Sequence, residues 1–202
     1  MITITFGELS TPAPVAKAEP EQKGMVHTVD IDNEDSEEHE FLEHLVTKAS
    51  ELGLITNGKT KHFYTRGAFD LVDLVVYVLK QTGAAHVFVS SYGIASDTIR
   101  TLKKCVEVGK ILSIRFLLDN RVRSISPKPF DAMVRAFPGN YRLNSVHAKC
   151  ALVWNDEWHI SIIGSQNATH NPKLERDTIY TDPRIWEFDR DNLELAYSEG
   201  TT

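Results

Sequence analysis

Polar residues whose side chains can bind and attack a phosphate group gather in one stretch of the chain, 146–175. His147 and Lys149 interrupt one apolar run, and Ser165 and Asn167 follow the next apolar run. Imidazole is both a nucleophile and a proton carrier near neutral pH, and ammonium, hydroxyl and amide groups supply positive charge and hydrogen-bond donors. The set therefore predicts an anion-binding site that contains a nucleophile.

The two apolar runs predict two neighbouring strands of a hairpin. The runs are Val146–Trp154 and Trp158–Gly164, both rich in β-branched residues, with a polar loop at 155–157. Such runs are typical of strands that are buried on both faces. Side chains two residues apart on a strand share a face, so we expect His147 and Lys149 to point the same way.

The length of the loop decides which residues of the two strands face each other. A loop of three residues places Lys149 opposite Ile163 and His147 opposite Ser165, with Asn167 two residues further along. A loop of even length instead turns Ser165 to the opposite face, because a shift of one residue inverts the pattern. We expect the three-residue loop, which gathers the polar side chains on one face.

These residues resemble the signature of the phospholipase D superfamily of phosphodiesterases. That signature is His-x-Lys, an Asp after four further residues, and then Gly-Ser-x-Asn, usually followed by a Glu. The chain supplies His147–Lys149 and Gly164–Asn167, and Glu175 is the candidate for the Glu. The chain departs from the signature at the Asp, where Trp154 stands, and the nearest carboxylate is that of Asp156.

The resemblance implies a metal-independent phosphodiesterase that works through a phosphohistidine. In the family two His-x-Lys motifs meet around a twofold axis; this sequence contains one, which implies a homodimer with its active site on the axis. His147 of one subunit would attack phosphorus, and His147 of the other would protonate the leaving oxygen. Lys149, Asn167 and Ser165 would bind the phosphate. Glu175 would orient the histidine, and no cofactor is implied.

Strand and helix signals alternate through the rest of the chain, which favours an α/β fold. Strands are expected at 86–91, 111–118, 141–143 and 178–181, and helices at 68–79, 96–109, 129–137 and from 182 onward. Alternating elements of this kind form a sheet with helices on both faces and right-handed crossovers. We therefore predict a mixed, mostly parallel sheet flanked by helices, as in the phospholipase D fold.

The N-terminal quarter of the chain differs in composition from the remainder. Residues 1–35 are rich in Pro, Ala and Glu, and we expect an acidic arm. In 36–56 apolar residues alternate with charges, which predicts one amphipathic helix, and 57–202 are expected to form the catalytic domain. Residues 1–55 contain twelve Asp and Glu against three Lys and Arg, so an acidic segment that covers a basic site is a second interpretation.

Charge is distributed unevenly along the chain, and this bears on the substrate. The formal net charge of −6 argues against an indiscriminate nucleic-acid binder. Residues 97–149, however, contain eleven Lys and Arg against four Asp and Glu, a surplus that fits a polyanion at the site. We expect Arg121, Arg123, Arg142 and His170 to bind substrate. Nucleic acid, DNA in particular, is the expected substrate, and a nuclease the expected enzyme.

Two other functions stay open for this sequence. Trp154 in place of the signature Asp is consistent with a nucleic-acid-binding module that turns over slowly or not at all. A phospholipid phosphodiesterase or phosphatidyl transferase is the other alternative, although no apolar membrane-docking loop is evident. A zinc site made from His147, His159, His170 and Cys150 lacks a compact ligand pair and is not expected.

Cysteine content and hydropathy indicate where the protein functions. Cys105 and Cys150 are far apart and form no Cys-x-x-Cys motif, which fits a reducing compartment and two small core residues. The apolar run Leu74–Leu79 is too short to span a bilayer, and the first ten residues lack the features of a signal peptide. We expect a soluble, cytoplasmic protein without stable membrane insertion.

Overall fold

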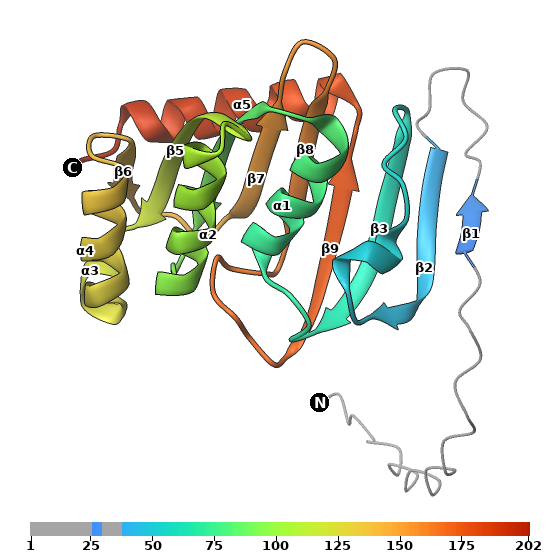
Figure 1. The fold of residues 1–202 in the computed structure, drawn as a ribbon, viewed down its shortest axis with the longest axis horizontal. Coiled ribbons are helices and arrows are strands. Elements are labelled where there is room, and N and C mark those ends of the chain that lie inside the picture. Colours follow the sequence, from blue (N-terminus) through green and yellow to red (C-terminus); the bar gives the residue numbers. More distant parts are fainter. Residues whose placement is uncertain (1–25, 30–37) are drawn as a thin grey trace, which may run out of the picture.

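A nine-stranded mixed sheet forms the centre of the computed structural model, which describes residues 26–29 and 38–202 (Figure 1). The strands are β1 (Val26–Val29), β2 (Glu38–Val46), β3 (Lys59–Arg66), β4 (Ala85–Ser91), β5 (Ile111–Asp119), β6 (Tyr141–Asn144), β7 (Lys149–Trp154), β8 (His159–Gly164) and β9 (Leu174–Tyr180). Their order across the sheet is β1-β2-β3-β9-β8-β7-β4-β5-β6. The predicted hairpin, β7 and β8, therefore lies in the interior of the sheet with a strand on either side.

The directions of the strands differ in part from the prediction. The α/β class with a mixed sheet is confirmed, but five of the eight pairings in the described residues are antiparallel. The parallel pairs are β2–β3, β4–β5 and β5–β6. The expectation of a mostly parallel sheet is wrong because the chain runs from β7 to β8 and on to β9 without a helical crossover, and such direct returns give antiparallel neighbours.

Five α-helices are described, and two of them begin at residues whose side chains cap the helix. Within the described residues they are α1 (Leu71–Thr82), α2 (Ser96–Glu107), α3 (Val122–Ile125), α4 (Pro127–Ala136) and α5 (Pro183–Ser198), with a 3₁₀ helix at Ala49–Leu52. The Asp70 carboxylate accepts hydrogen bonds from Val72 N and Asp73 N at 2.8 and 3.1 Å, which caps α1. Asp182, the N-cap of α5, accepts from Arg184 N at 2.8 Å.

Helices cover both faces of the sheet, as predicted (Figure 1). On one face α1, α2 and α4 bury a large core that includes Leu74, Leu102 and Met133. On the other face α5 packs Trp186 and Leu193 against the sheet in a smaller core. Full burial of each such side chain stabilises the fold by roughly 1.5–3 kcal/mol. The two cores hold the central strands in place from both sides.

Residues from Glu38 onward form β2 and a 3₁₀ helix instead of the helix predicted at 36–56. Leu42 and Val46 of β2 are buried, while Phe41 and Leu45 are exposed, and the pairing with β3 shifts register between residues 41 and 45. The helix prediction is wrong because this apolar spacing also fits a strand with a bulge. The open edge of β3 needs hydrogen-bond partners, and tertiary pairing then overrides local propensity.

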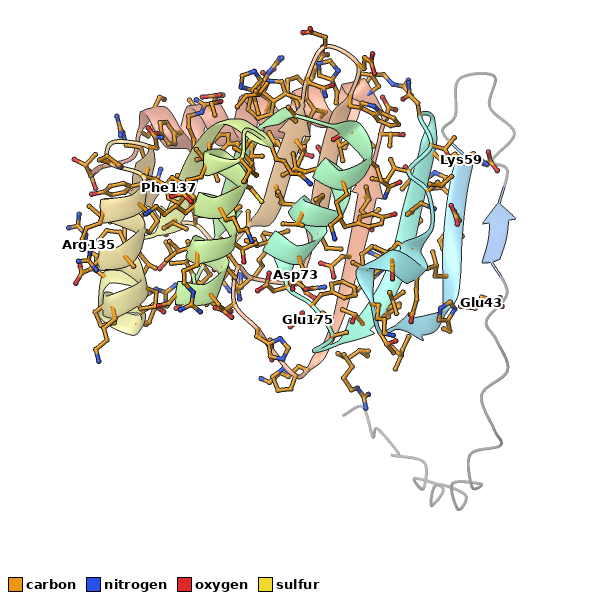
Figure 2. The ribbon with its side chains drawn as sticks, viewed as in Figure 1. Glu43, Lys59, Asp73, Arg135, Phe137 and Glu175 are labelled. Carbon is orange, nitrogen blue, oxygen red and sulfur yellow. The ribbon has the colours of Figure 1, made fainter. Side chains whose placement is uncertain are left out.

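The N-terminal part of the described chain lies at one edge of the sheet. Glu43 in β2 and Arg135 in α4 are at opposite ends of the molecule (Figure 2). Of the predicted acidic arm, Val26–Val29 forms β1, which pairs antiparallel with β2. The other residues of the arm, 1–25 and 30–35, lie outside the described residues. The domain boundary expected at residue 57 stays a prediction, and β2 belongs to the same sheet as the strands beyond that boundary.

Both cysteines are buried and unpaired. Cys105 belongs to the larger core and Cys150 to the smaller one, as the sequence predicts. Burial raises the pKa of both thiols, which keeps them in the less reactive protonated form. No helix in the described ranges is long and apolar enough to cross a membrane.

Candidate active site

The β7–β8 hairpin pairs in a register one residue away from the predicted one. Lys149 lies opposite Gly164 instead of the expected Ile163. The loop contains four residues, and Asn155 N donates to Trp158 O at 3.0 Å. Asn155 Oδ1 also accepts from Glu157 N at 3.0 Å, an Asx turn, and from Trp158 N at 2.9 Å, and these bonds accommodate the extra residue. The register prediction is wrong because the loop has four residues instead of three. If the strand continued past Gly164, an even loop would turn Ser165 to the other face of the sheet.

Ser165 nevertheless lines the same cavity as Lys149, because β8 ends at Gly164 and the chain turns there. Ser165 N donates to Arg176 O, and Ser165 Oγ accepts from Arg176 N, both at 3.0 Å. Ser165 Oγ donates to the Glu175 carboxylate. The single hydroxyl proton of Ser165 is therefore directed at Glu175, and the hydroxyl must give up that hydrogen bond before it can donate to a substrate.

His147 and Lys149 lie together at the open end of the hairpin. His147 precedes β7, whereas the sequence predicts it inside the strand, and its side chain is exposed. Lys149 Nζ donates to His147 O at 2.8 Å and lies 3.2 and 3.1 Å from the ring nitrogens Nδ1 and Nε2. Burial lowers the pKa of Lys149, and the nearby Glu175 and Asp119 carboxylates offset part of this effect. A fixed ammonium thus stands directly beside the imidazole.

The turn that contains Asn167 is tied to β4 and to the first turns of two helices. Asn167 Oδ1 accepts from Tyr92 N at 3.3 Å, and the Asn167 carbonyl accepts from Leu71 N of α1 at 3.3 Å. The carbonyl of Ala168 accepts from Ala95 N, just before α2, at 3.0 Å. The Nδ2 group of Asn167 has no hydrogen-bond partner among the described residues, so it is available to donate to a phosphate oxygen.

Glu175 is buried in β9, with 7% of its surface exposed, and it anchors the turn after β8. Its carboxylate accepts from Ser165 Oγ and from Asn171 Nδ2. Within the part of the chain that is described it makes no hydrogen bond to His147. The expectation that Glu175 orients His147 is therefore not met inside one subunit, and it stays a prediction for a contact between subunits.

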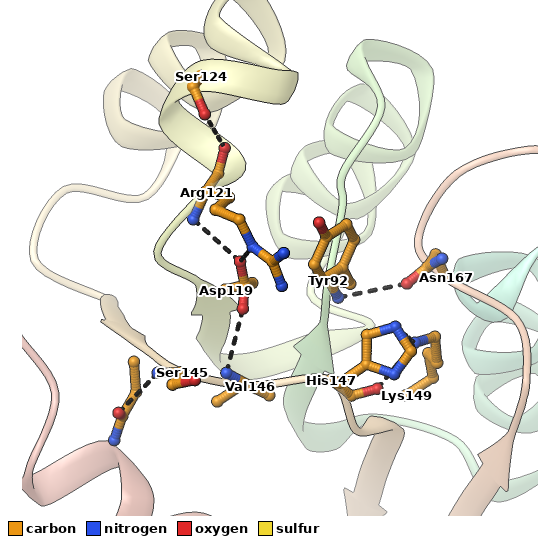
Figure 3. A network of polar contacts seen from close by, with 10 residues as sticks. Tyr92, Asp119, Arg121, Ser124, Ser145, Val146, His147, Lys149 and Asn167 are labelled. Carbon is orange, nitrogen blue, oxygen red and sulfur yellow. Dashed lines mark hydrogen bonds and ion pairs between the residues drawn. The ribbon is translucent and has the colours of Figure 1, made fainter.

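Two residues that the sequence analysis did not select complete the network around His147 (Figure 3). Asp119, at the end of β5, accepts from Arg121 Nε at 2.8 Å and from Val146 N at 3.3 Å. Tyr92 directly follows β4, and its ring centre is 5.3 Å from that of His147. A signal for both was present, since they stand at the carboxyl ends of buried parallel strands, where ligands bind in α/β sheets.

One of the four expected substrate-binding residues reaches the network around His147. Arg121 reaches it through Tyr92, whose ring centre is 4.7 Å from Arg121 Cζ. Arg123 and Arg142 instead lie over the rings of Phe130 and Tyr197, at 5.5 and 5.0 Å. His170 is exposed in the turn before β9, with no hydrogen bond to another described residue.

A cavity of about 540 Å³ opens beside His147 and Lys149. It lies between the open end of the hairpin and α5, and residues of both elements line it: His147, Lys149, Ser165, Asp189, Asn192 and Leu193. Burial raises the pKa of Asp189 above its ordinary value. The volume is that of a small-molecule site. The sequence motif gave no indication that α5 would line this cavity.

Trp154, which stands where the family signature has Asp, is remote from these side chains. It lies at the opposite end of β7 from Lys149, about 17 Å away at the usual rise of a strand. Its ring stacks on His86 and packs against Trp186, with ring centres 5.4 and 5.7 Å apart. Trp154 therefore stabilises the packing of β7 on β4 and α5, and it is too far away to touch a phosphate beside Lys149.

The side chains of the zinc alternative are not gathered into one ligand set. His159 packs against Trp186 at the end of β8 that lies away from Lys149, with ring centres 4.6 Å apart. His170 is exposed in its turn. No group of three or more His, Cys, Asp or Glu side chains in residues 26–29 and 38–202 is arranged to hold a metal ion.

A hydrogen bond between two buried side chains, those of Gln166 and Asp177, joins the turn after β8 to β9. Asp177 is fully buried (0% exposed), and its Oδ2 accepts from Gln166 Nε2 at 2.6 Å. Asp177 Oδ1 and Gln166 Oε1 are also buried, and neither has a donor among the described residues. Burial raises the pKa of Asp177 from its ordinary value of 3.8 to about 6. A proton on Asp177 removes the negative charge from this fully buried side chain.

We expect Asp177→Asn to be tolerated and to remove a pH dependence of stability. Because the pKa of Asp177 is raised on folding, the folded protein binds the extra proton between about pH 4 and 6, and the wild type loses stability as pH rises through that window. The full shift corresponds to about 3 kcal/mol. Asn cannot ionise, and its side-chain oxygen can still accept from Gln166 Nε2. At pH 7.5 the unfolding free energy of the variant should therefore exceed that of the wild type by that order.

Urea unfolding of both proteins at pH 4 and pH 7.5 measures this difference in unfolding free energy. Asp131→Asn, at an exposed position of α4, controls for the loss of one carboxylate. A difference that stays constant over this pH range would show that the charge state of Asp177 is the same in the folded and unfolded protein.

Comparison with known proteins identifies the fold. No protein-family model and no curated protein matches the sequence. Solved structures do match: Nuc, a phospholipase D family member from Salmonella typhimurium, is 18% identical with a TM-score of 0.51 over 70% of this chain and 95% of its own. NucT from Helicobacter pylori is 13% identical with a TM-score of 0.51 over 70% of this chain and 98% of its own.

A third similar structure is much longer than this chain. The polyphosphate kinase from Porphyromonas gingivalis is 16% identical with a TM-score of 0.54, over 76% of this chain but only 29% of its own. At these identities the likeness concerns the fold. This chain has the fold of the phospholipase D superfamily, as the motif in the sequence predicts.

Proposed function

We propose that this protein is a phosphodiesterase that cleaves nucleic acid, DNA in particular, through a phosphohistidine formed by His147. The main support is the convergence of His147, Lys149 and Ser165 on one cavity. A nucleophile next to fixed positive charge and hydrogen-bond donors is the arrangement that phosphoryl transfer needs. The phospholipase D fold adds support by analogy.

In the first step a ring nitrogen of His147 attacks phosphorus. A P–N bond forms while the P–O bond to the leaving group breaks, and the leaving oxygen takes a proton from a second imidazole. Charge that builds up on the equatorial oxygens is balanced by the Lys149 ammonium and by the Nδ2 group of Asn167. Ser165 and Glu175 hold the turn that contains Asn167.

The second imidazole belongs to His147 of the partner subunit. Each subunit supplies one His-x-Lys motif, and His147 is the one histidine that lines the cavity in the described residues. In the second step a water oxygen attacks phosphorus, the P–N bond breaks, and the imidazole of the partner subunit accepts the water proton. A twofold axis at the cavity would bring the two imidazoles to opposite sides of one phosphate.

Cleavage of labelled single- and double-stranded DNA in excess EDTA tests this proposal. We expect the wild type to cleave at least one of them, and His147→Asn at equal purity to cleave neither. Activity that requires added divalent metal, or that survives the His147 replacement, would contradict the mechanism. Binding without cleavage by either protein would favour the nucleic-acid-binding module.

A phospholipid substrate is a second candidate because α5, which lines one side of the cavity, also carries exposed apolar side chains. Phe188 and Leu195 are 69% and 59% exposed. Such side chains could touch the acyl region of a membrane. Head-group release from phosphatidylcholine vesicles by the wild type, without DNA cleavage, would favour this candidate.

A further inference from the structure

Two cationic side chains have the ring of Tyr92 as a common neighbour (Figure 3). Arg121 Cζ is 4.7 Å and Lys149 Nζ is 5.8 Å from the ring centre, so the two charges cannot be farther apart than the sum of these distances. His147 packs against the same ring at an interplanar angle of 67°. Tyr92 thus keeps a second positive charge close to the nucleophile.

Asp119 fixes Arg121 and leaves the end of its guanidinium open. Asp119 Oδ1 accepts from the Nε and the backbone N of Arg121 at 2.8 and 3.0 Å. Burial acts to raise the pKa of Asp119, but hydrogen bonds from Arg121 outweigh it and lower the pKa, which keeps the carboxylate ionised. The Arg121 side chain is 63% exposed, and its two Nη groups have no hydrogen-bond partner in the described part of the chain. They can bind an anion in bidentate fashion.

We propose that Arg121, positioned by Tyr92 and Asp119, binds the phosphate next to the one that His147 attacks. This inference rests on the proposed phosphodiesterase function and adds a specificity-determining contact to it. Both cations lie against one tyrosine ring, so anions bound by Lys149 and Arg121 lie close enough together to be neighbouring phosphates of one strand. The site therefore selects strands with consecutive phosphodiesters, and a substrate with a single phosphodiester leaves Arg121 without an anion.

Replacement of Arg121 by Gln separates this contact from the chemical step. The two substrates, compared in EDTA, are bis(4-nitrophenyl) phosphate, with one phosphodiester, and a labelled single-stranded octanucleotide. We expect Arg121→Gln to raise the KM for the octanucleotide about tenfold, as for loss of a charge-assisted hydrogen bond. The slope of log KM against log salt should fall by about 0.7. The kcat/KM for the single diester should change less than twofold.

Three further variants sharpen the comparison. Arg121→Lys keeps the charge and should recover part of the octanucleotide KM. Arg135→Gln removes an equal charge from an exposed position of α4, far from Glu175 (Figure 2), and should leave both substrates unaffected. Tyr92→Ala should reduce activity on both substrates, because His147 also packs against that ring.

An equal loss on both substrates in Arg121→Gln would overturn the proposal and limit Arg121 to a support for Tyr92. An unchanged octanucleotide KM and salt slope would overturn it as well. If the wild type hydrolysed neither substrate, the proposed function would fail. The affinity for the octanucleotide would then test the role of Arg121 separately. Fluorescence anisotropy of the octanucleotide with His147→Asn protein should then show the same tenfold weakening when Arg121→Gln is added, and equal affinities would overturn it.

Discussion

His147→Asn is expected to lower phosphodiester hydrolysis by about 10⁴-fold or more, because one position supplies both the nucleophile and the general acid when two subunits meet. Asparagine retains a polar side chain but cannot form a stable bond to phosphorus or carry a proton at neutral pH. The side chain of His147 is exposed in front of β7, so its replacement leaves no cavity in the core. The unfolding free energy should therefore change by no more than about 0.5 kcal/mol.

Initial rates on bis(4-nitrophenyl) phosphate and on DNA, with urea unfolding of the same preparations, measure both parts of this expectation. His86→Asn is the matched control, since His86 of β4 bonds to Ser113 Oγ at 2.7 Å and stacks on Trp154, at the far end of β7 from Lys149. It should keep near wild-type turnover. Loss of activity in His147→Asn that accompanies unfolding would leave no evidence for a chemical role.

Mixing the two proteins tests whether both subunits contribute. If each active site needs two His147 side chains, activity should follow the square of the wild-type fraction after subunit exchange. An equal mixture should then retain about a quarter of the activity, against about half for subunits that act independently. A linear dependence would contradict the shared site, even if His147 itself were essential.

Gly164→Ala should be the most destabilising small substitution in the motif. A Cβ at residue 164 would stand 1.8 Å from Asp177 Oδ1 and 2.6 Å from Arg176 O. The second of these atoms is backbone, and Gly164 pairs with Asp177 in the β8–β9 ladder, so the strands must separate to make room. We expect a loss of about 3 kcal/mol or more of unfolding free energy. Separation would also disturb Ser165, which bonds to Arg176 through both its N and its Oγ.

Urea unfolding of Gly164→Ala beside Gly93→Ala measures this effect. A Cβ at residue 93 would meet Thr169 Cγ2 at an ordinary 3.5 Å, and Gly93 has no positive φ, so that variant should be unchanged or more stable by up to about 1 kcal/mol. Adding Asp177→Ser to Gly164→Ala removes the side-chain clash alone and should recover part of the loss. Equal stability of Gly164→Ala and the wild type would show that β8 and β9 adjust without cost.

Most helices and strands after β3 were predictable because their signals are local. Apolar runs between turn residues locate β4, β5 and β6, and the Asp182-Pro183 pair marks the start of α5. Such signals depend on neighbours within one or two turns of the chain. The strand at β2 was not predictable in this way, because Leu42 and Val46 are buried only once β3 offers its edge.

Contacts around the site were less accessible to the sequence than its chemistry. Tyr92, Asp119 and Arg121 stand far from His147 in the chain, and they meet because β4 and β5 run parallel with their carboxyl ends at the same edge of the sheet. The partner of Glu175 also depends on one extra residue in the β7–β8 loop. The sequence does not show whether the loop has three or four residues, because the Asn155 side chain can form hydrogen bonds within a turn of either length.

The class of the fold and the chemical character of the site follow from the order of the residues alone. An unpaired ammonium in a buried strand is costly, so the spacing of His147 and Lys149 ahead of Gly164–Asn167 indicates an anion site on the hairpin. The hairpin register, the role of Glu175 as anchor of Ser165, and the place of Arg121 beside Tyr92 were settled by tertiary contacts. They depend on which backbone edges and polar groups still need partners after the helices pack on the sheet, and no local pattern contains that information.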